Sequence, residues 1–261
     1  MVSARDYLTS LAANGRYCFT MSDARRALGG SVVAVRAALR RLTRRGEIAC
    51  PYRGFHVVVP PEYRRLGCLP PEQFVPHLLR YLHEVYYVAL LSAAELHGAA
   101  HNRPQRFQVM VARNRRSIEC GQVRVQFVAR QDLARTPVVE MNTPRGAMRV
   151  SSVEATALEV VGYANQCGGL HNVAAVLAEL AEVADASKLL DVARLCPIAW
   201  SQRLGYLLEI ADQGDLAGGL AAHVDEHART VAPLVRAKPM TAAPRSARWK
   251  LAINAVVEPD V

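Results

Sequence analysis

The sequence of 261 residues is 51% hydrophobic and 21% charged, and its formal net charge is +9. A chain of this length can bury a core of its own without disulfides or bound metals. The longest uncharged apolar run, Tyr86 to Ala94, is about half as long as a membrane-spanning helix requires, and residues 1–7 lack the apolar segment of a secretory signal. The composition excludes disordered, collagen-like and membrane-spanning proteins, and it predicts a cytoplasmic protein with no membrane partner.

Basic residues concentrate at the start of the chain. Residues 1–65 hold twelve lysines and arginines against four acidic residues, whereas residues 151–261 hold nine against thirteen. This polarity predicts a small basic module that binds a polyanion, joined to a body with a different role.

The six cysteines are irregularly spaced and include no Cys-x-x-Cys pair. This spacing favours neither a zinc knuckle nor a redox pair. Without a secretory signal, reduced and mostly buried thiols are the better expectation. We expect no metal and no cofactor.

Three short helical patterns open the chain. Their predicted limits are residues 4–13, Thr20 or Ser22 to Leu28, and residues 32–45. Ser31 is placed to cap the third helix, which Gly29 and Gly30 join tightly to the second. On this third helix apolar residues form one stripe and five arginines occupy the opposite face. These arginines are Arg36, Arg40, Arg41, Arg44 and Arg45.

After Gly46 the hydrophobic period changes from 3.6 to 2. Residues 47–50 and 55–59 read as two strands with a turn at residues 51–54. Three helices followed by a hairpin are typical of a winged helix-turn-helix, in which the third helix enters the major groove of double-stranded DNA.

Charge and position select the residues expected to contact DNA. They are Ser22, Arg25, Ser31, Arg36, Arg40, Arg41, Arg44 and Arg53. Ser31, Val33 and Arg36 would face base edges, whereas Arg40 and Arg44 would meet phosphates. Ser22 and Arg25 would hold a phosphate at the start of the second helix, and Arg53 would reach the DNA from the hairpin tip. Two alternatives are a solvated arginine face and a winged helix that binds protein.

The body of the chain combines sheet and helix. A linker is predicted at residues 61–71, bracketed by Pro60-Pro61 and Pro70-Pro71. Helices are then expected at residues 72–83, 88–97, 153–165, 170–183, 187–195, 199–211 and 217–230. Strands are expected at residues 106–112, 122–129, 138–142, 147–151 and 249–257, and the tail at residues 232–248 is expected to be partly loose. The fold class is therefore α+β, with a winged helix at residues 1–60 and a second domain of a small mixed sheet plus several helices at residues 72–261.

Five segments of the chain resemble, in order, the AbiEi family, the antitoxin halves of AbiE-type toxin–antitoxin pairs. They are Tyr86–Gly98, Arg115–Gly121, Arg149–Leu158, Arg203–Glu209 and Trp249–Asp260. In the third segment Ser152-Val153 stands where the family usually has Asp-Pro.

The resemblance implies a non-enzymatic antitoxin of a type IV system. Its winged helix would bind repeats in its own promoter and repress it, and its body would counter a nucleotidyltransferase-fold toxin encoded beside it. The cationic run Arg113, Arg115 and Arg116 is the candidate for neutralisation, since a toxin that binds nucleotide or tRNA has a phosphate-binding surface for which such a run could compete. Promoter sites are expected in pairs, as inverted repeats, because one small module contacts too little DNA to be selective.

Parts of the sequence are compatible with two other functions. The string His223-Val-Asp-Glu226-His227 matches the inverted zinc-protease motif, but no helix after it offers a third ligand, so a solvated helix face explains it better. The second is a winged-helix transcription regulator that responds to a small molecule and has no toxin partner; a neighbouring gene for an enzyme or transporter would favour it.

Overall fold

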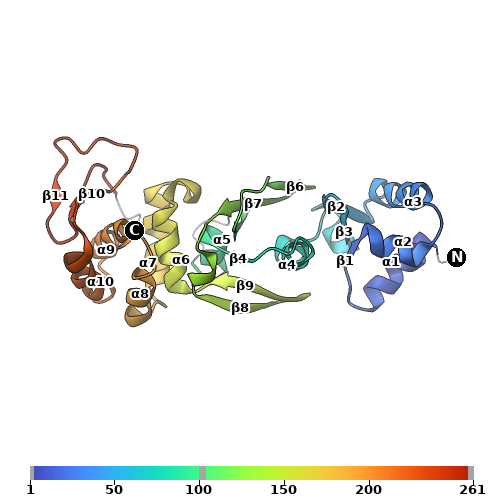
Figure 1. Ribbon diagram of the computed structural model, residues 1–261, viewed down its shortest axis with the longest axis horizontal. Helices are drawn as coiled ribbons and strands as arrows, with labels where there is room; N and C mark the ends of the chain where they lie inside the picture. The colour runs from blue at the N-terminus through green and yellow to red at the C-terminus, as the bar shows by residue number, and fades with distance from the viewer. Residues whose placement is uncertain (1–2, 100–103, 258–261) are drawn as a thin grey trace. The chain divides into compact units, whose positions relative to one another are not determined.

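The computed structural model describes residues 3–99 and 104–257, and its fold is α+β, as predicted (Figure 1). Its contacts divide the chain into two compact units. Unit 1 comprises Met1–Tyr86, Gln105–Gln131 and Glu140–Arg149, and unit 2 comprises Tyr87–Pro104, Asp132–Val139 and Val150–Val261. In the described ranges no helix has the length and apolarity needed to cross a membrane.

The start of unit 1 consists of three helices and a small antiparallel sheet. The helices are α1 (Ala4–Ala13), α2 (Met21–Leu28) and α3 (Val32–Arg44), and the strands are β1 (Cys18–Thr20), β2 (Ile48–Tyr52) and β3 (Phe55–Val58). The strand order is β1-β3-β2. The side chains of Ser3, Thr20 and Ser31 cap the three helices in turn. These capping residues explain why the sequence predicts where the helices begin. The arrangement is compatible with the predicted winged helix.

Both faces of β3 are buried. Val58 packs on the core of the three helices with Phe19 and Leu39, whereas Phe55 and Val57 belong to a second core. Because β3 is covered on both faces, the hairpin cannot swing as a free wing, and its exposed residues are Cys50, Tyr52 and Arg53.

The second core joins the hairpin to the rest of unit 1. This part contains a short 3-10 turn (Pro61–Tyr63), α4 (Pro71–Tyr81), β5 (Phe107–Val111), β6 (Ile118–Cys120) and β7 (Val123–Ala129). The strands lie in the order β6-β7-β5, with β5 parallel to β7. Within the segment predicted as a linker, Cys68 and Leu69 are fully buried in this core, so the segment packs against its neighbours.

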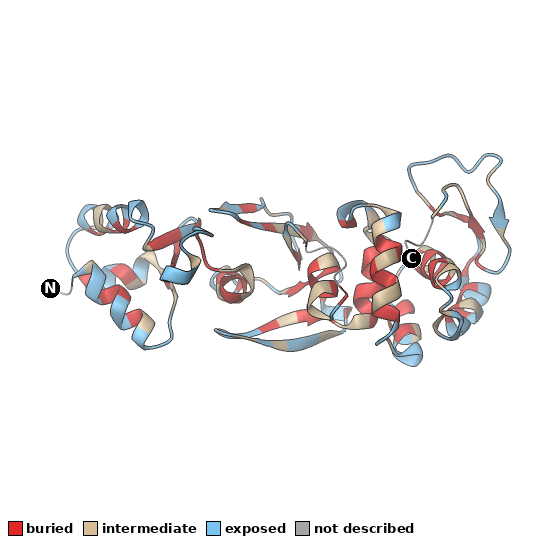
Figure 2. Ribbon diagram, turned by 180° about the vertical axis from the view of Figure 1, so that it is seen from behind, coloured by how far each residue is buried: buried red, intermediate tan, exposed pale blue. Residues whose placement is uncertain are grey.

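Unit 2 is mainly helical. Its helices are α5 (Leu90–Leu96), α6 (Val153–Gly162), α7 (Leu170–Ala181), α8 (Ala186–Ala193), α9 (Ile198–Ile210) and α10 (Gly214–His227), with 3-10 turns at Leu133–Arg135 and Ala164–Cys167. Its strands are β4 (Tyr86–Val88), β8 (Val138–Thr143), β9 (Gly146–Ser151), β10 (Ala232–Pro233), β11 (Arg245–Ser246) and β12 (Leu251–Ala252). Strands β8 and β9 are shared between the units, because residues 140–149 belong to unit 1. Val88 of β4 pairs in parallel with Val150 of β9. Helix α6 contacts α5, α7, α8 and α9, and Figure 2 shows it buried along most of its length.

Several predicted limits were wrong. The helix expected from Val88 starts at Leu90, after strand β4. The strand expected over residues 249–257 is confined to Leu251–Ala252, and residues 258–261 lie outside the described residues. The tail expected to be partly loose also contributes the two-residue strands β10 and β11, which flank β12 in a three-stranded sheet.

No disulfide joins any of the six cysteines. Cys68 and Cys167 are buried, and Cys50 is exposed. Burial raises the pKa of the Cys167 thiol to about 12, and the nearby Glu159 carboxylate acts in the same direction.

Candidate nucleic-acid interface

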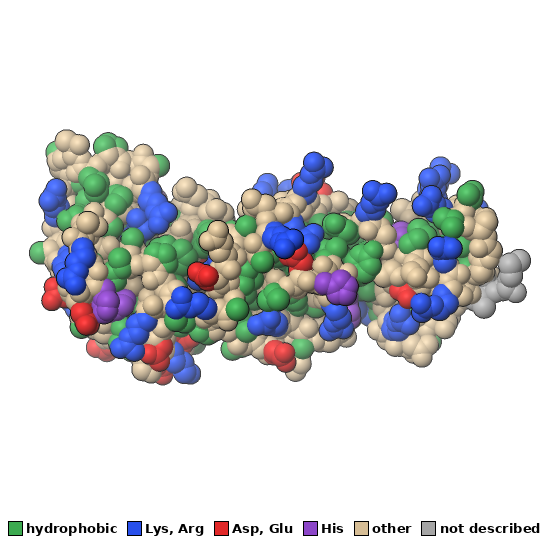
Figure 3. Space-filling model, in the orientation of Figure 1, with side chains coloured by type: hydrophobic (Ala, Val, Ile, Leu, Met, Phe, Trp, Pro, Cys, Tyr) green, Lys and Arg blue, Asp and Glu red, His purple; other side chains and the backbone are tan. Residues whose placement is uncertain are grey.

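The outer face of α3 carries a row of exposed arginines. Val35, Leu39 and Leu42 of this helix are buried, which turns the opposite face to solvent. The exposed side chains on it are Arg36, Arg40, Arg41, Arg44 and Arg45. In the described part of the chain none of the five forms an ion pair with a carboxylate. Figure 3 shows Lys and Arg side chains gathered over the surface where α3 lies.

The first turn of α3 combines a polar cap with an exposed apolar group. The Ser31 hydroxyl accepts a hydrogen bond from the Ala34 backbone N–H at 3.2 Å, so it also fixes the start of the helix. Val33 is 75% exposed. An exposed valine beside a capping serine suits contact with a thymine methyl group in the major groove.

The hairpin turn lies against the start of α2. The backbone N–H of Met21 donates to the Gly54 carbonyl at 3.0 Å. Ser22, Arg25 and Arg53 are all exposed. This backbone hydrogen bond joins the turn that carries Arg53 to the helix that carries Ser22 and Arg25.

A carboxylate occupies the first turn of α2. Thr20 and Asp23 form a reciprocal capping box, in which the Asp23 carboxylate accepts from the Thr20 backbone N–H at 2.8 Å. Partial burial opposes ionisation of Asp23, but the hydrogen bonds from Thr20 and the charges of Arg16 and Arg26 hold its pKa below the usual value. This negative charge weakens the attraction of the helix N-terminus for a phosphate. The exposed Arg26, which sequence reasoning missed, adds a cation beside it.

The predicted neutralisation run is divided by the fold. Arg113 and Arg116 are exposed. Arg115 is turned inward, and its guanidinium pairs with the Glu84 carboxylate at 2.6 Å, with the two side chains 22% and 12% exposed. A hydrogen bond with Tyr52 of β2 adds to this contact, so Arg115 ties the hairpin to the following core.

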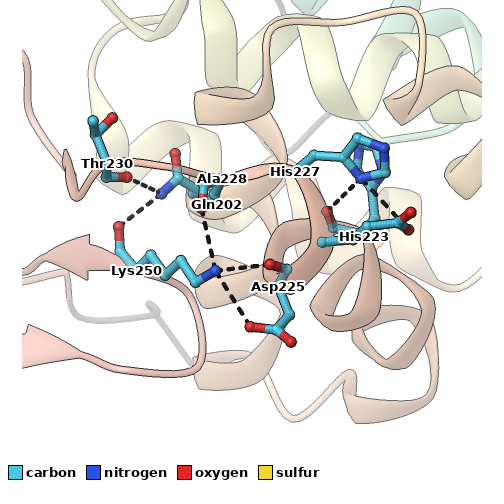
Figure 4. Close-up of polar contacts among 8 residues, drawn as sticks. Gln202, His223, Asp225, His227, Ala228, Thr230 and Lys250 are labelled. Atoms are coloured by element: carbon cyan, nitrogen blue, oxygen red, sulfur yellow. Dashed lines mark hydrogen bonds and ion pairs between the residues drawn. The ribbon is translucent and has the colours of Figure 1, made fainter.

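The two histidines of α10, His223 and His227, contact each other and the helix backbone. Figure 4 shows the imidazoles of His223 and His227 one turn apart, with ring centroids separated by 4.6 Å. The His227 ring contacts the His223 carbonyl at 3.1 Å, and Lys250 pairs with Asp225 at 3.3 Å. Among the described residues no group of three or more His, Cys, Asp or Glu side chains could hold a metal ion.

The fold and its basic face define an α+β protein that joins a winged-helix-like basic module to a helical domain. Residues 87–210 match the AbiEi antitoxin C-terminal domain, so the resemblance is confirmed over that segment. The match supports an antitoxin role and suggests a regulator rather than an enzyme.

A solved structure of similar fold covers nearly the whole chain. It is the RV2827C protein from Mycobacterium tuberculosis, which is 18% identical with a TM-score of 0.70, over 95% of this chain and 90% of that chain. At this identity the likeness concerns the fold alone. No curated protein matches the chain.

Proposed function

We propose that this protein is a DNA-binding antitoxin that represses its own promoter and counteracts a nucleotidyltransferase-type toxin encoded beside it. The observation that supports DNA binding best is the arginine face of α3, which is exposed and has no carboxylate partner in the described residues. A row of cations without counter-charges releases bound counterions from DNA when it meets phosphates, which makes binding favourable and salt-dependent.

The residues divide by role along the helix. Ser31, Val33 and Arg36 lie in the first turns of α3, where a recognition helix meets base edges. Arg40, Arg41 and Arg44 lie further along and would contact phosphates, which fixes position without reading sequence. Ser22, Arg25 and Arg53 would hold the neighbouring backbone from the start of α2 and the hairpin turn.

Binding to the promoter of its own operon tests this proposal. Fluorescence anisotropy would compare promoter DNA with scrambled DNA over a range of salt concentrations. We expect Arg36→Ala to cost about 1–3 kcal/mol and to relax preference for the promoter, whereas Arg40→Ala should weaken both DNAs alike and lower the salt slope by about one. The exposed Arg229 of unit 2 offers a control, Arg229→Ala, with unchanged binding. Equal affinity for both DNAs, unaffected by the α3 variants, would contradict a specific repressor.

For neutralisation we propose the two exposed members of the cationic run, Arg113 and Arg116. A toxin that binds nucleotide or tRNA presents a surface for phosphate, and exposed guanidinium groups can compete for the same anion. The double variant Arg113→Glu/Arg116→Glu should reduce rescue of cells that express the toxin, while Lys188→Glu on α8 should not. Full rescue by the double variant, at equal protein level, would show that Arg113 and Arg116 do not act in neutralisation.

A further inference from the structure

Unit 2 contains a cavity of about 500 Å³ that none of the roles above uses. Its walls come from residues 161–166 and 169–171, from Arg203 on α9, and from residues 234–238 and 255–256. This volume lies in the range of pockets that hold small molecules. The residues that line it lie far apart in sequence, so the folded domain assembles it.

Among the described residues, the cavity is lined by cations and by no acidic side chain. Arg203, Arg236 and Lys238 contribute to the lining, together with His171. Arg203 is 4% exposed. Its Nε donates to the Pro233 carbonyl at 2.9 Å, and its two terminal amino groups have no partner in the described part of the chain.

A buried guanidinium without a counter-charge is costly. Burial, with the nearby Arg236 charge, lowers the pKa of Arg203 to about 10, and the side chain is still protonated at neutral pH. The fold thus holds donors for an anion in place before the anion arrives.

The N-terminus of α7 adds a second source of positive potential. This helix has twelve residues, Leu170–Ala181, and no side chain in the described part of the chain caps it at Gly169. Gly169, Leu170 and His171 line the cavity. The first N–H groups of a helix have no acceptor within the helix, and they favour an anion such as phosphate.

We propose that this cavity binds a small phosphate-bearing molecule, with its phosphate held by Arg203 and the N-terminus of α7. Arg236 and Lys238 are exposed and contribute charge at the solvent side. Val161, Leu234 and Val256 provide apolar wall for the uncharged part of a ligand the size of a mononucleotide. The proposal is independent of DNA binding and of toxin neutralisation.

Tryptophan emission provides a local readout in the full chain. Both tryptophans, Trp200 and Trp249, lie in unit 2. The Trp200 ring lies 5.5 Å from the ring of Tyr163, centroid to centroid, and Tyr163 lines the cavity. Phosphate that binds the arginines of unit 1 has no tryptophan to perturb there.

The protein would be titrated at constant ionic strength with inorganic phosphate, pyrophosphate, AMP, adenosine and succinate. We expect a saturable change in emission with the phosphate compounds and none with adenosine or succinate. Tighter binding of AMP than of inorganic phosphate would support a nucleotide ligand, and equal binding would support a free-phosphate site. Absence of saturation by every phosphate compound, or equal affinity for succinate, would overturn the proposal.

Variants at the exposed side of the cavity test the assignment without disturbing the core. Arg236→Ala/Lys238→Ala should weaken phosphate binding about tenfold, as the loss of charge-assisted contacts implies. The matched control is Arg229→Ala/Lys188→Ala, which also removes one arginine and one lysine from exposed positions of unit 2. Arg203→Lys should weaken binding further while a far-ultraviolet spectrum shows the fold retained. Equal weakening in the control would assign the effect to net charge and contradict a built site.

Discussion

Gly205 of α9 lies directly against the indole ring of Trp249, so closely that a Cβ atom at position 205 would overlap the ring. Trp249 is fully buried, and its indole N–H donates to the carboxylate of Glu209, one turn further along α9. Residues from two of the segments that resemble the AbiEi family therefore contact each other, although Glu209 and Trp249 lie forty positions apart in the sequence. Gly162 of α6 likewise lies so close to the Trp200 ring that a Cβ atom at position 162 would overlap it.

This contact predicts that Gly205→Ala destabilises unit 2. The added methyl group has no space beside a buried indole, and overpacking of this kind costs about 1–3 kcal/mol. Gly218 of α10 has open space around its Cβ position, so the matched variant Gly218→Ala should stabilise the protein by about 0.5–1 kcal/mol through helix propensity. Urea unfolding followed by tryptophan emission measures both. A Gly205→Ala protein as stable as Gly218→Ala would show that the indole can move aside.

His56 makes the helical core of unit 1 sensitive to acid. Its ring stacks on Phe19 at 5.3 Å between centroids, both ring nitrogens are buried without a hydrogen-bond partner in the described residues, and burial lowers its pKa. The unfolded chain takes up a proton on this ring near pH 6.5, whereas the folded chain does so only at lower pH. Stability is therefore highest above pH 6.5 and falls as the pH drops below it.

Replacing His56 by phenylalanine should remove this contribution. The variant His56→Phe keeps the ring stack and discards two unsatisfied polar atoms, so we expect little loss of stability at pH 7.5. Between about pH 6.5 and 5 the unfolding free energy of the variant should fall less steeply with decreasing pH than that of the wild type. The two slopes should differ by up to about 1.4 kcal/mol per pH unit. Parallel pH profiles for the two proteins would mean that His56 is protonated alike in both states.

Arg115 should matter for stability, whereas Arg113 and Arg116 should not. Arg115→Ala leaves the Glu84 carboxylate, 12% exposed, without its cation and should cost about 1.5–3 kcal/mol. Arg113→Ala/Arg116→Ala changes only exposed side chains and should stay within about 0.5 kcal/mol of the wild type. Denaturant unfolding of the three proteins compares them directly, and equal midpoints for all three would contradict the ion pair as a structural link.

The helices at the start of unit 1 could be predicted closely because their limits are local. A serine or threonine cap begins each of α1, α2 and α3, and the apolar stripe of α3 specifies which face is buried. Strand β1 could not be predicted, since its three residues become a strand only through pairing with β3. The same reason shortens the closing strand, because β12 depends on two-residue pairings with β10 and β11.

The candidate sites also differ in how far the sequence alone could predict them. The arginine face of α3 follows from helical period alone, and the structure leaves all five arginines exposed. The inward turn of Arg115 depends on Glu84, thirty-one residues earlier, and nothing local indicates it. The cationic cavity draws on four separate parts of the chain, so only the fold could reveal it.

We propose that one chain represses its promoter through α3 and counteracts a toxin through its C-terminal domain. The most direct test places the neighbouring toxin gene and a reporter of the operon promoter in the same cells, with wild type or with Arg36→Ala/Arg40→Ala at matched protein levels. We predict that the variant loses repression of the reporter and still rescues growth from the toxin. A variant that represses as well as the wild type, or a wild type that neither represses nor rescues, would contradict the account.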